Sequence, residues 1–181
     1  IIDGISENPI SDFNFNHLFQ HIFDESIIRV GFAWASDYYL IGNTFPFLKP
    51  LMQNEKRKSL CIKKLVEGIL KNSEAEDAVF NGQKLSSVSL SKVSKAILGI
   101  ELDKEMQRSD WTRRPLAGEQ KLYAIIDAIV VILIEEKIRN ALKKNLNATL
   151  ASKIMEEGYV SMKQDKATID ELTKTFNNVS I

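Results

Sequence analysis

The chain has 181 residues, of which 44% are hydrophobic and 27% are charged, with 24 basic side chains against 24 acidic ones. This apolar fraction excludes a disordered chain, and the absence of an apolar run of about 20 residues excludes a membrane-spanning helix. The single cysteine, Cys61, excludes an internal disulfide, so we expect a reducing compartment, either cytoplasm or nucleus, and no membrane association.

The N-terminal part of the chain alternates strand-like and helix-like segments. Residues 1–3 read as the end of a strand, and residues 14–23 place their apolar side chains on one face of a helix. Residues 27–34 are β-branched and aromatic, which predicts a buried strand. We expect a short helix after Asp37 that ends before a turn region at residues 42–50.

The middle of the chain continues the alternation. Residues 59–70 predict a short strand followed by a helix, and Cys61 within them is expected to be a small buried side chain. Residues 73–88 mix acidic and small residues and predict a loop. Residues 89–98 predict a helix that Ser89 caps and Gly99 ends.

The C-terminal part is helical throughout. Residues 118–144 predict the longest helix, whose first half is apolar enough to be buried on most faces. Residues 145–181 predict two short helices around Gly158, the second opened by a capping box at Thr168. The mixture of strands and helices along the whole chain favours an α/β or α+β domain.

The zero net charge hides an uneven distribution along the chain. Residues 1–48 hold one basic residue against six acidic ones, whereas residues 49–72 hold seven basic residues against two acidic ones. Residues 104–121 are modestly basic, with five basic residues against three acidic ones. Such a pattern suits a metal-dependent nuclease, with carboxylates for cations and basic residues for phosphates. Ordinary solvated faces explain the same charge runs, and charge alone favours that interpretation.

A string of short motifs follows residue 97. In chain order they are Leu98-Gly99, Asp103-Lys104, Ser109-Asp110-Trp111, Arg114-Pro115-Leu116 and Tyr123-Ala124-Ile125-Ile126-Asp127-Ala128. Upstream, residues 22–41 combine a helix end, an apolar strand and Asp37 just beyond that strand. Together these segments resemble the 3′-5′ exonuclease domain of the DEDD superfamily, DEDDy type, in the RNase D and Werner branch. They are most similar to its Nibbler and mutator members, which trim small RNAs.

The last motif has a physical meaning of its own. Tyr123 and Asp127 are four residues apart on a predicted helix, so both side chains leave the same face and can serve one site. A carboxylate on an apolar helix is costly to bury unless it meets a cation or several donors, and a hard divalent metal ion is the obvious partner. The alternative is that Asp127 lies at the helix surface without a ligand.

The resemblance implies roles for five residues. Asp37 and Asp127 are implied as catalytic acids that bind Mg²⁺ or Mn²⁺, and Tyr123 as the residue that orients the attacking water. Lys104 and Arg114 are implied as basic residues that bind the substrate. Each has an ordinary alternative: Asp37 as a helix N-cap, Tyr123 as a core residue, and the two cations as surface charges.

The resemblance also implies a fold and a domain plan. We expect an α/β, ribonuclease H-like exonuclease fold, a mixed sheet flanked by helices, over residues 1–144, here lacking its first strands. Residues 145–181 are then a helical extension or linker that can bind a protein partner. The expected activity is hydrolysis at the 3′ end of single-stranded RNA by two metal ions.

One element of the family pattern is absent from the sequence. The first Asp-x-Glu motif, which supplies two further metal ligands, is expected before residue 1, so this chain alone is expected to be inactive. Ala33 stands where the RNase D branch often has asparagine before the second acid. The alternative to an enzyme is a catalytically inactive module that keeps the exonuclease fold as a scaffold for protein and RNA assembly.

Overall fold

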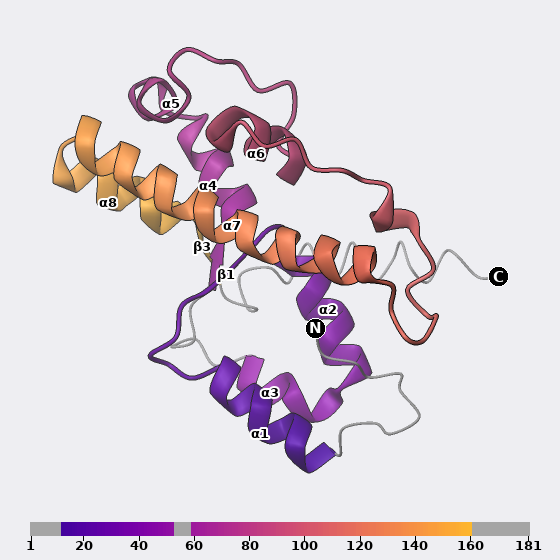
Figure 1. The fold of residues 1–181 in the computed structure, drawn as a ribbon. Helices are drawn as coiled ribbons and strands as arrows, with labels where there is room; N and C mark the ends of the chain where they lie inside the picture. The colour runs from indigo at the N-terminus through magenta and orange to yellow at the C-terminus, as the bar shows by residue number, and fades with distance from the viewer. Residues whose placement is uncertain (1–11, 53–58, 161–181) are drawn as a thin grey trace, which may run out of the picture.

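The computed structural model describes residues 12–52 and 59–160, which form helices grouped around a small sheet (Figure 1). The strand end expected at residues 1–3 and the helix expected from Thr168 lie outside the described residues. Among the helices that are described, none is long and apolar enough to cross a membrane.

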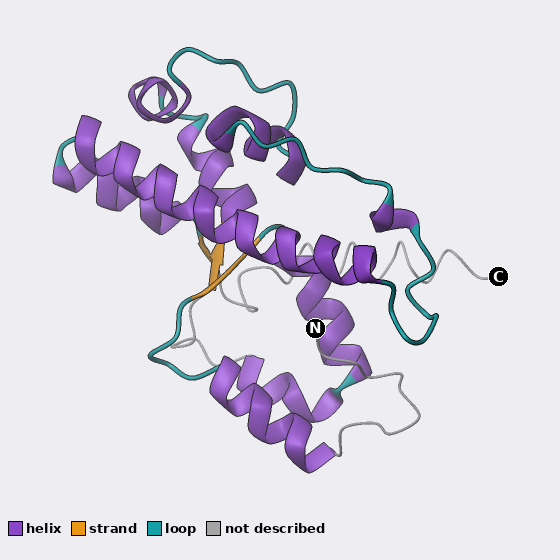
Figure 2. Ribbon diagram, in the orientation of Figure 1, coloured by secondary structure: helices purple, strands orange, loops and turns teal. Residues whose placement is uncertain are grey.

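The described sheet has three short strands, drawn in orange in Figure 2: β1 (Arg29–Gly31), β2 (Ser59–Cys61) and β3 (Tyr159–Val160). The order is β1-β2-β3, with β1 parallel and β3 antiparallel to β2. All three residues of β2 are buried, so this strand is the centre of the sheet. A mixed sheet flanked by helices is the predicted α/β architecture.

Five helices pack with β2 around the larger of two hydrophobic clusters. They are α4 (Ile62–Ile69), α5 (Ser73–Phe80), α6 (Leu90–Leu98), α7 (Gly118–Asn145) and α8 (Ala148–Glu157). The helix α7 contacts the other four helices and β1, and Figure 1 shows it running across the whole group.

A second, smaller cluster joins the elements near the N-terminus. It is formed by α1 (Asp12–Ile22), α2 (Trp34–Thr44), the 3₁₀-helix η1 (Pro46–Leu48) and α3 (Lys49–Met52). Its buried members are Phe19, Phe23, Tyr38, Leu48 and Met52. Figure 1 shows α1 and α3 side by side, with α2 leading from them toward the sheet.

Most predicted elements are confirmed. Helices occur at residues 12–22, 90–98, 118–145 and 148–157, and a strand followed by a helix occurs at residues 59–69. Ser89 accepts a hydrogen bond from the Lys92 N–H, and Gly99 ends its helix with a φ of 70°. Cys61 is buried, as expected of a small apolar side chain.

The segment around β1 differs from the prediction. The strand has only three residues, and Ile27 and Ile28 before it are about half exposed. It ends because Ala33 adopts the left-handed conformation, with φ 59° and ψ 49°, and α2 begins at the next residue. Asp37 therefore lies in the first turn of α2 rather than before a helix, and α2 continues through Gly42.

The loop predicted for residues 73–88 is wrong in its first half. Residues 73–80 form α5, because the Asn72 side chain accepts the Ala75 N–H at 2.9 Å and so caps the helix. Ala75 and Phe80 are buried against the core, and Asn81 ends the helix in the left-handed conformation. The acidic residues that suggested a loop occupy the first turn, where the helix dipole favours negative charge.

The first half of α7 is not buried on most faces, contrary to the prediction. Its exposed apolar residues are Leu122, Ile125, Ile126 and Ile129, and Ile132 and Leu133 just beyond it are exposed too. Apart from Gln120, the buried residues of α7 begin only at Val130. The reason is geometric: the described elements that pack on α7, among them α5, α6 and β1, leave these apolar side chains exposed.

The end of the described chain belongs to the same core. The Cys61 N–H donates to the Gly158 carbonyl at 2.8 Å, β3 pairs with β2, and Ile154 on α8 is buried in the main cluster. The division of the chain at residue 144 stays a prediction, but residues 148–160 pack as part of the sheet and its helices.

Gly158 offers a test of this packing. A Cβ atom there would lie 2.7 Å from Leu60 Cδ1 and 2.8 Å from Leu65 Cβ, so Gly158→Ala forces the central strand and α4 apart. We expect a loss of about 1–3 kcal/mol in the free energy of unfolding, measured by urea denaturation.

The matched control is Gly118→Ala, at the start of α7. A Cβ atom at Gly118 meets nothing within 4 Å. This variant should change the free energy of unfolding by less than about 0.5 kcal/mol. Equal stability of the two variants would contradict the packing described for Gly158.

Candidate functional site

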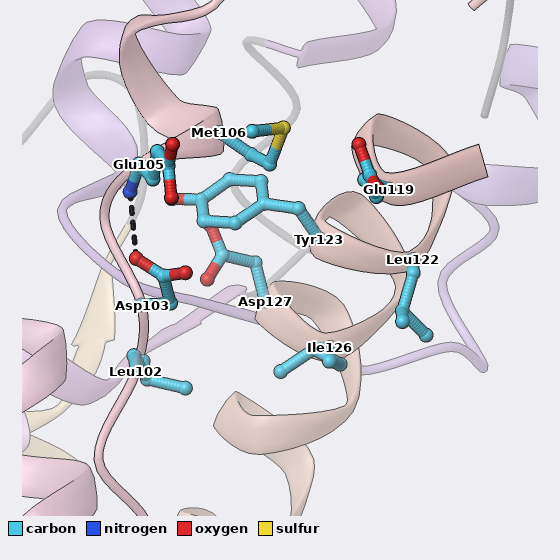
Figure 3. Close-up of a pocket in the computed structure, with 9 residues that line it drawn as sticks. All are labelled: Leu102, Asp103, Glu105, Met106, Glu119, Leu122, Tyr123, Ile126 and Asp127. Carbon is cyan, nitrogen blue, oxygen red and sulfur yellow. Dashed lines mark hydrogen bonds between the residues drawn. The ribbon is translucent and has the colours of Figure 1, made fainter. Parts of the chain in front are cut away.

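A pocket of about 400 Å³ lies between the first turns of α7 and the loop that leads from α6 through the 3₁₀-helix η2 (Met106–Arg108). Figure 3 shows the residues that line it, four from the loop side and five from α7. They are Leu102, Asp103, Glu105, Met106, Glu119, Leu122, Tyr123, Ile126 and Asp127. The pocket thus combines four carboxylates and one phenol with apolar walls.

The structure brings two of the five predicted site residues into this pocket, Tyr123 and Asp127. Both lie on the same side of α7, as their spacing predicts, and the Tyr123 ring extends over the Asp127 carboxylate (Figure 3). The pKa of Tyr123 is raised to about 12. The causes are burial, the hydrogen bond that Tyr123 donates to Asp127, and the negative charges of Asp127 and Asp103. The phenol therefore stays protonated at neutral pH and remains a hydrogen-bond donor.

Sequence reasoning missed the loop carboxylates. Asp103 points to the same side of the pocket as Asp127, and its negative charge contributes to the raised pKa of Tyr123. Its conformation is fixed locally, because its Oδ1 accepts the Glu105 N–H at 2.8 Å. The signal for Asp103 was the Asp103-Lys104 motif, but the resemblance implied a site role only for Lys104. Lys104 is exposed and does not line the pocket, whereas both of its neighbours do.

Asp37 lies apart from this pocket. It is on the exposed side of α2, does not line the pocket, and partial burial of its carboxyl raises its pKa. Two neighbours attach α2 to the central strand: Trp34 Nε1 donates to the Leu60 carbonyl at 3.1 Å, and the Tyr38 hydroxyl hydrogen-bonds Ser59 Oγ. Asp37 therefore has a fixed position on α2, at the carboxyl end of β1.

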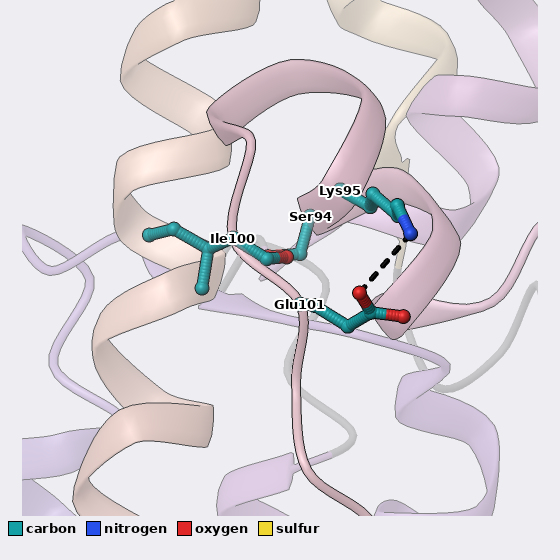
Figure 4. A network of polar contacts seen from close by, with 4 residues as sticks. All are labelled: Ser94, Lys95, Ile100 and Glu101. Atoms are coloured by element: carbon teal, nitrogen blue, oxygen red, sulfur yellow. Dashed lines mark hydrogen bonds and ion pairs between the residues drawn. The ribbon is translucent and has the colours of Figure 1, made fainter.

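Arg114 donates hydrogen bonds to the backbone of its own loop. It is half-buried, and one of its terminal nitrogens donates to the Trp111 and Arg113 carbonyls at 2.9 Å each. Its role in substrate binding stays a prediction. The loop is also anchored at its start, where Ser94 Oγ donates to the Ile100 carbonyl and Lys95 pairs with Glu101 (Figure 4).

The pocket suits a hard cation in its ligand chemistry. Carboxylate oxygens are the ligands that Mg²⁺ and Mn²⁺ prefer, and Asp127 presents one beside a second carboxylate. Within residues 12–52 and 59–160, however, no three Asp, Glu, His or Cys side chains converge closely enough to hold a metal ion. A complete coordination shell at Asp127 therefore needs further ligands, from water, substrate or other polypeptide.

Comparison with known proteins gives a consistent result. A family model described as 3′-5′ exonuclease matches residues 8–143. Exonuclease mut-7 of Caenorhabditis elegans is 31% identical over 148 residues, which cover 80% of this chain and 16% of that protein. The mut-7 homologues of Drosophila melanogaster and Homo sapiens are 30% and 28% identical, over 74% and 73% of this chain and 21% and 15% of their own lengths.

A solved structure supports the fold. The crystal structure of the Aedes aegypti Nibbler EXO domain superposes with a TM-score of 0.64 and 20% sequence identity, covering 81% of this chain and 68% of that one. The ribonuclease H-like exonuclease fold predicted from the motifs is thereby confirmed. The chain spans only about a fifth or less of the curated relatives just named.

The ionisation of Tyr123 tests the geometry of the pocket. Asp127→Asn removes both a negative charge and a carboxylate acceptor, so the pKa of Tyr123 should fall from about 12 toward its ordinary value. Asp103→Asn should produce a smaller fall, because Asp103 acts only through its charge. Ultraviolet titration of tyrosinate measures both, with Tyr123→Phe identifying this residue among the four tyrosines. An unchanged titration curve for Asp127→Asn would contradict the contact.

Proposed function

The chain belongs to the 3′-5′ exonuclease family, and on that premise we propose that it removes nucleotides from single-stranded RNA 3′ ends. The resemblance to the Nibbler and mutator type supports a place in a small-RNA silencing pathway. The observation that carries the proposal is the pairing of Tyr123 with Asp127 in one pocket, because the resemblance implies these two as the tyrosine and the last acid of the family motif.

Asp127 and Asp37 are the residues that would hold Mg²⁺ or Mn²⁺. When bound, such ions supply an activated water and stabilise the leaving oxygen. Tyr123 is suited to orienting a water rather than to removing its proton, because a phenol with a pKa of about 12 stays protonated at neutral pH. Leu102, Met106 and Ile126 contribute apolar surface beside the carboxylates.

We also propose that two further acids, those of the family's first Asp-x-Glu motif, complete the site beside Asp37 and Asp127.

We also propose that part of residues 145–181 binds a protein partner. Within the described residues the available surface is a pocket of about 360 Å³ between α7 and α8. It has apolar residues such as Leu146 and Met155 and a charged rim that includes Lys143 and Glu156. A partner helix or strand with apolar side chains and mixed charge fits that composition.

Asp127→Asn in the complete protein tests the enzymatic proposal. Loss of a metal-ligand charge should abolish Mg²⁺- or Mn²⁺-dependent 3′ trimming of a labelled single-stranded RNA, resolved on a denaturing gel. RNA affinity should change little, because the substituted group is not a cation that binds phosphate.

The matched control is Asp77→Asn, the same chemical change on the exposed face of α5. This variant should trim at the wild-type rate. Trimming by Asp127→Asn at the wild-type rate would sink the catalytic assignment. A wild-type protein that binds RNA but does not trim it would favour the inactive scaffold instead.

A further inference from the structure

Gln120 is a fully satisfied buried polar residue beside the pocket. Its side chain is only 4% exposed, and an amide buried without partners would cost several kcal/mol. Its Nε2 donates to Ser109 Oγ at 2.9 Å and to the Asp110 carbonyl at 3.0 Å, while its Oε1 accepts the Ala117 N–H at 2.9 Å. One side chain in the first turn of α7 therefore holds three points of the preceding loop.

These hydrogen bonds extend to the wall of the pocket. Ser109 Oγ, which accepts from Gln120, donates its own proton to the Met106 carbonyl at 2.8 Å. The same carbonyl accepts Trp111 Nε1 at 3.1 Å. Met106 lines the pocket, so a continuous path runs from α7 through Ser109 to the opposite wall.

The loop also carries an aromatic contact to the predicted catalytic tyrosine. The ring centroids of Trp111 and Tyr123 are 6.1 Å apart, with the ring planes at 57°. Tyr123 follows Gln120 by three residues on α7, so the amide anchor and the aromatic contact lie on neighbouring positions of one helix side. Gln120 itself does not line the pocket and cannot touch a ligand there.

We propose that Gln120 is a positioning residue: it fixes residues 103–117 on α7 and thereby sets the distance between the Tyr123–Asp127 face and the loop carboxylates. Its effect on catalysis rests on the proposed exonuclease function, whereas its effect on the loop does not. Because misplacement by about 1 Å in an active site can cost on the order of 100-fold in rate, such an anchor has kinetic consequences.

Gln120→Glu tests this role, with its free energy of unfolding measured by urea denaturation so that a displaced loop is distinguished from general destabilisation. The variant keeps the shape of the side chain and an oxygen that accepts the Ala117 N–H, and a negative charge in the first turn of a helix is favourable. It loses both N–H groups of Nε2, so the Asp110 carbonyl no longer receives a hydrogen bond from this side chain. The Ser109 hydroxyl then donates to the new carboxylate instead of to the Met106 carbonyl. Gln107→Glu is the matched control, because Gln107 is exposed in η2 of the same loop.

The experiment measures kcat and KM for 3′ trimming, and the fluorine NMR spectrum of fluorotryptophan-labelled protein, with full-length wild type and both variants. Trp111→Phe identifies the Trp111 resonance, and the Trp34 resonance is an internal control. For Gln120→Glu we expect kcat to fall by about 10-fold or more with little change in KM, and the Trp111 resonance alone to shift. Gln107→Glu should match the wild type in both measurements.

Wild-type kcat in Gln120→Glu would overturn the proposal, as would a lower kcat with an unmoved Trp111 resonance. If Gln120→Glu does not fold, Ser109→Ala removes the hydroxyl that links Gln120 to Met106 and leaves the hydrogen bonds of Gln120 to Asp110 and Ala117, so it should give a smaller change in the same direction. An unmoved resonance and an unchanged kcat in that variant would overturn the proposal too. If the wild type does not trim RNA at all, the proposed function fails, and the Trp111 resonance still decides whether Gln120 positions the loop.

Discussion

The fold and the site both depend on one stripe of side chains along α7. The buried residues of α7 recur every three or four positions, and the last of them, Ile134, Ile138 and Leu142, are completely inaccessible in the main core. Traced toward the N-terminus, the same spacing passes through Val130 and then Asp127, Tyr123 and Gln120. The site residues therefore occupy the start of the core-facing stripe, and hydrophobic burial at one end of a rigid helix orients the polar groups at the other.

That continuity explains which parts of the site the sequence predicted. The pairing of Tyr123 with Asp127 is a local property of helix geometry, so their spacing was sufficient. Asp103 enters the pocket only because the loop before α7 folds back onto it, through contacts that no local pattern encodes. The exposed side of α7 was mispredicted for a related reason: an apolar helix indicates that burial is favourable but not which faces the neighbouring elements cover.

The helices and strands also divide into those that local sequence determines and those that distant contacts determine. The helix that Ser89 and Gly99 delimit was predictable from capping, and Asn72 is the corresponding capping signal for α5. The early end of β1 could not be predicted in this way, because a left-handed alanine costs roughly 1 kcal/mol and is adopted only when surrounding contacts require it. Those contacts are the attachments of α2 to β2 through Trp34 and Tyr38. An asparagine at this position would tolerate the left-handed conformation more readily than Ala33.

The pKa values of Tyr123 and Asp37 are shifted in the same direction. Tyr123 and Asp37 both have raised pKa values, each first through burial, and two neighbouring carboxylates add to the shift of Tyr123. Each effect disfavours negative charge, yet no basic residue lines the pocket, and Arg114 donates to backbone carbonyls of the loop instead. Four carboxylates line the pocket without a basic residue among them, and a divalent cation bound there would offset their negative charge, which is consistent with metal-dependent chemistry.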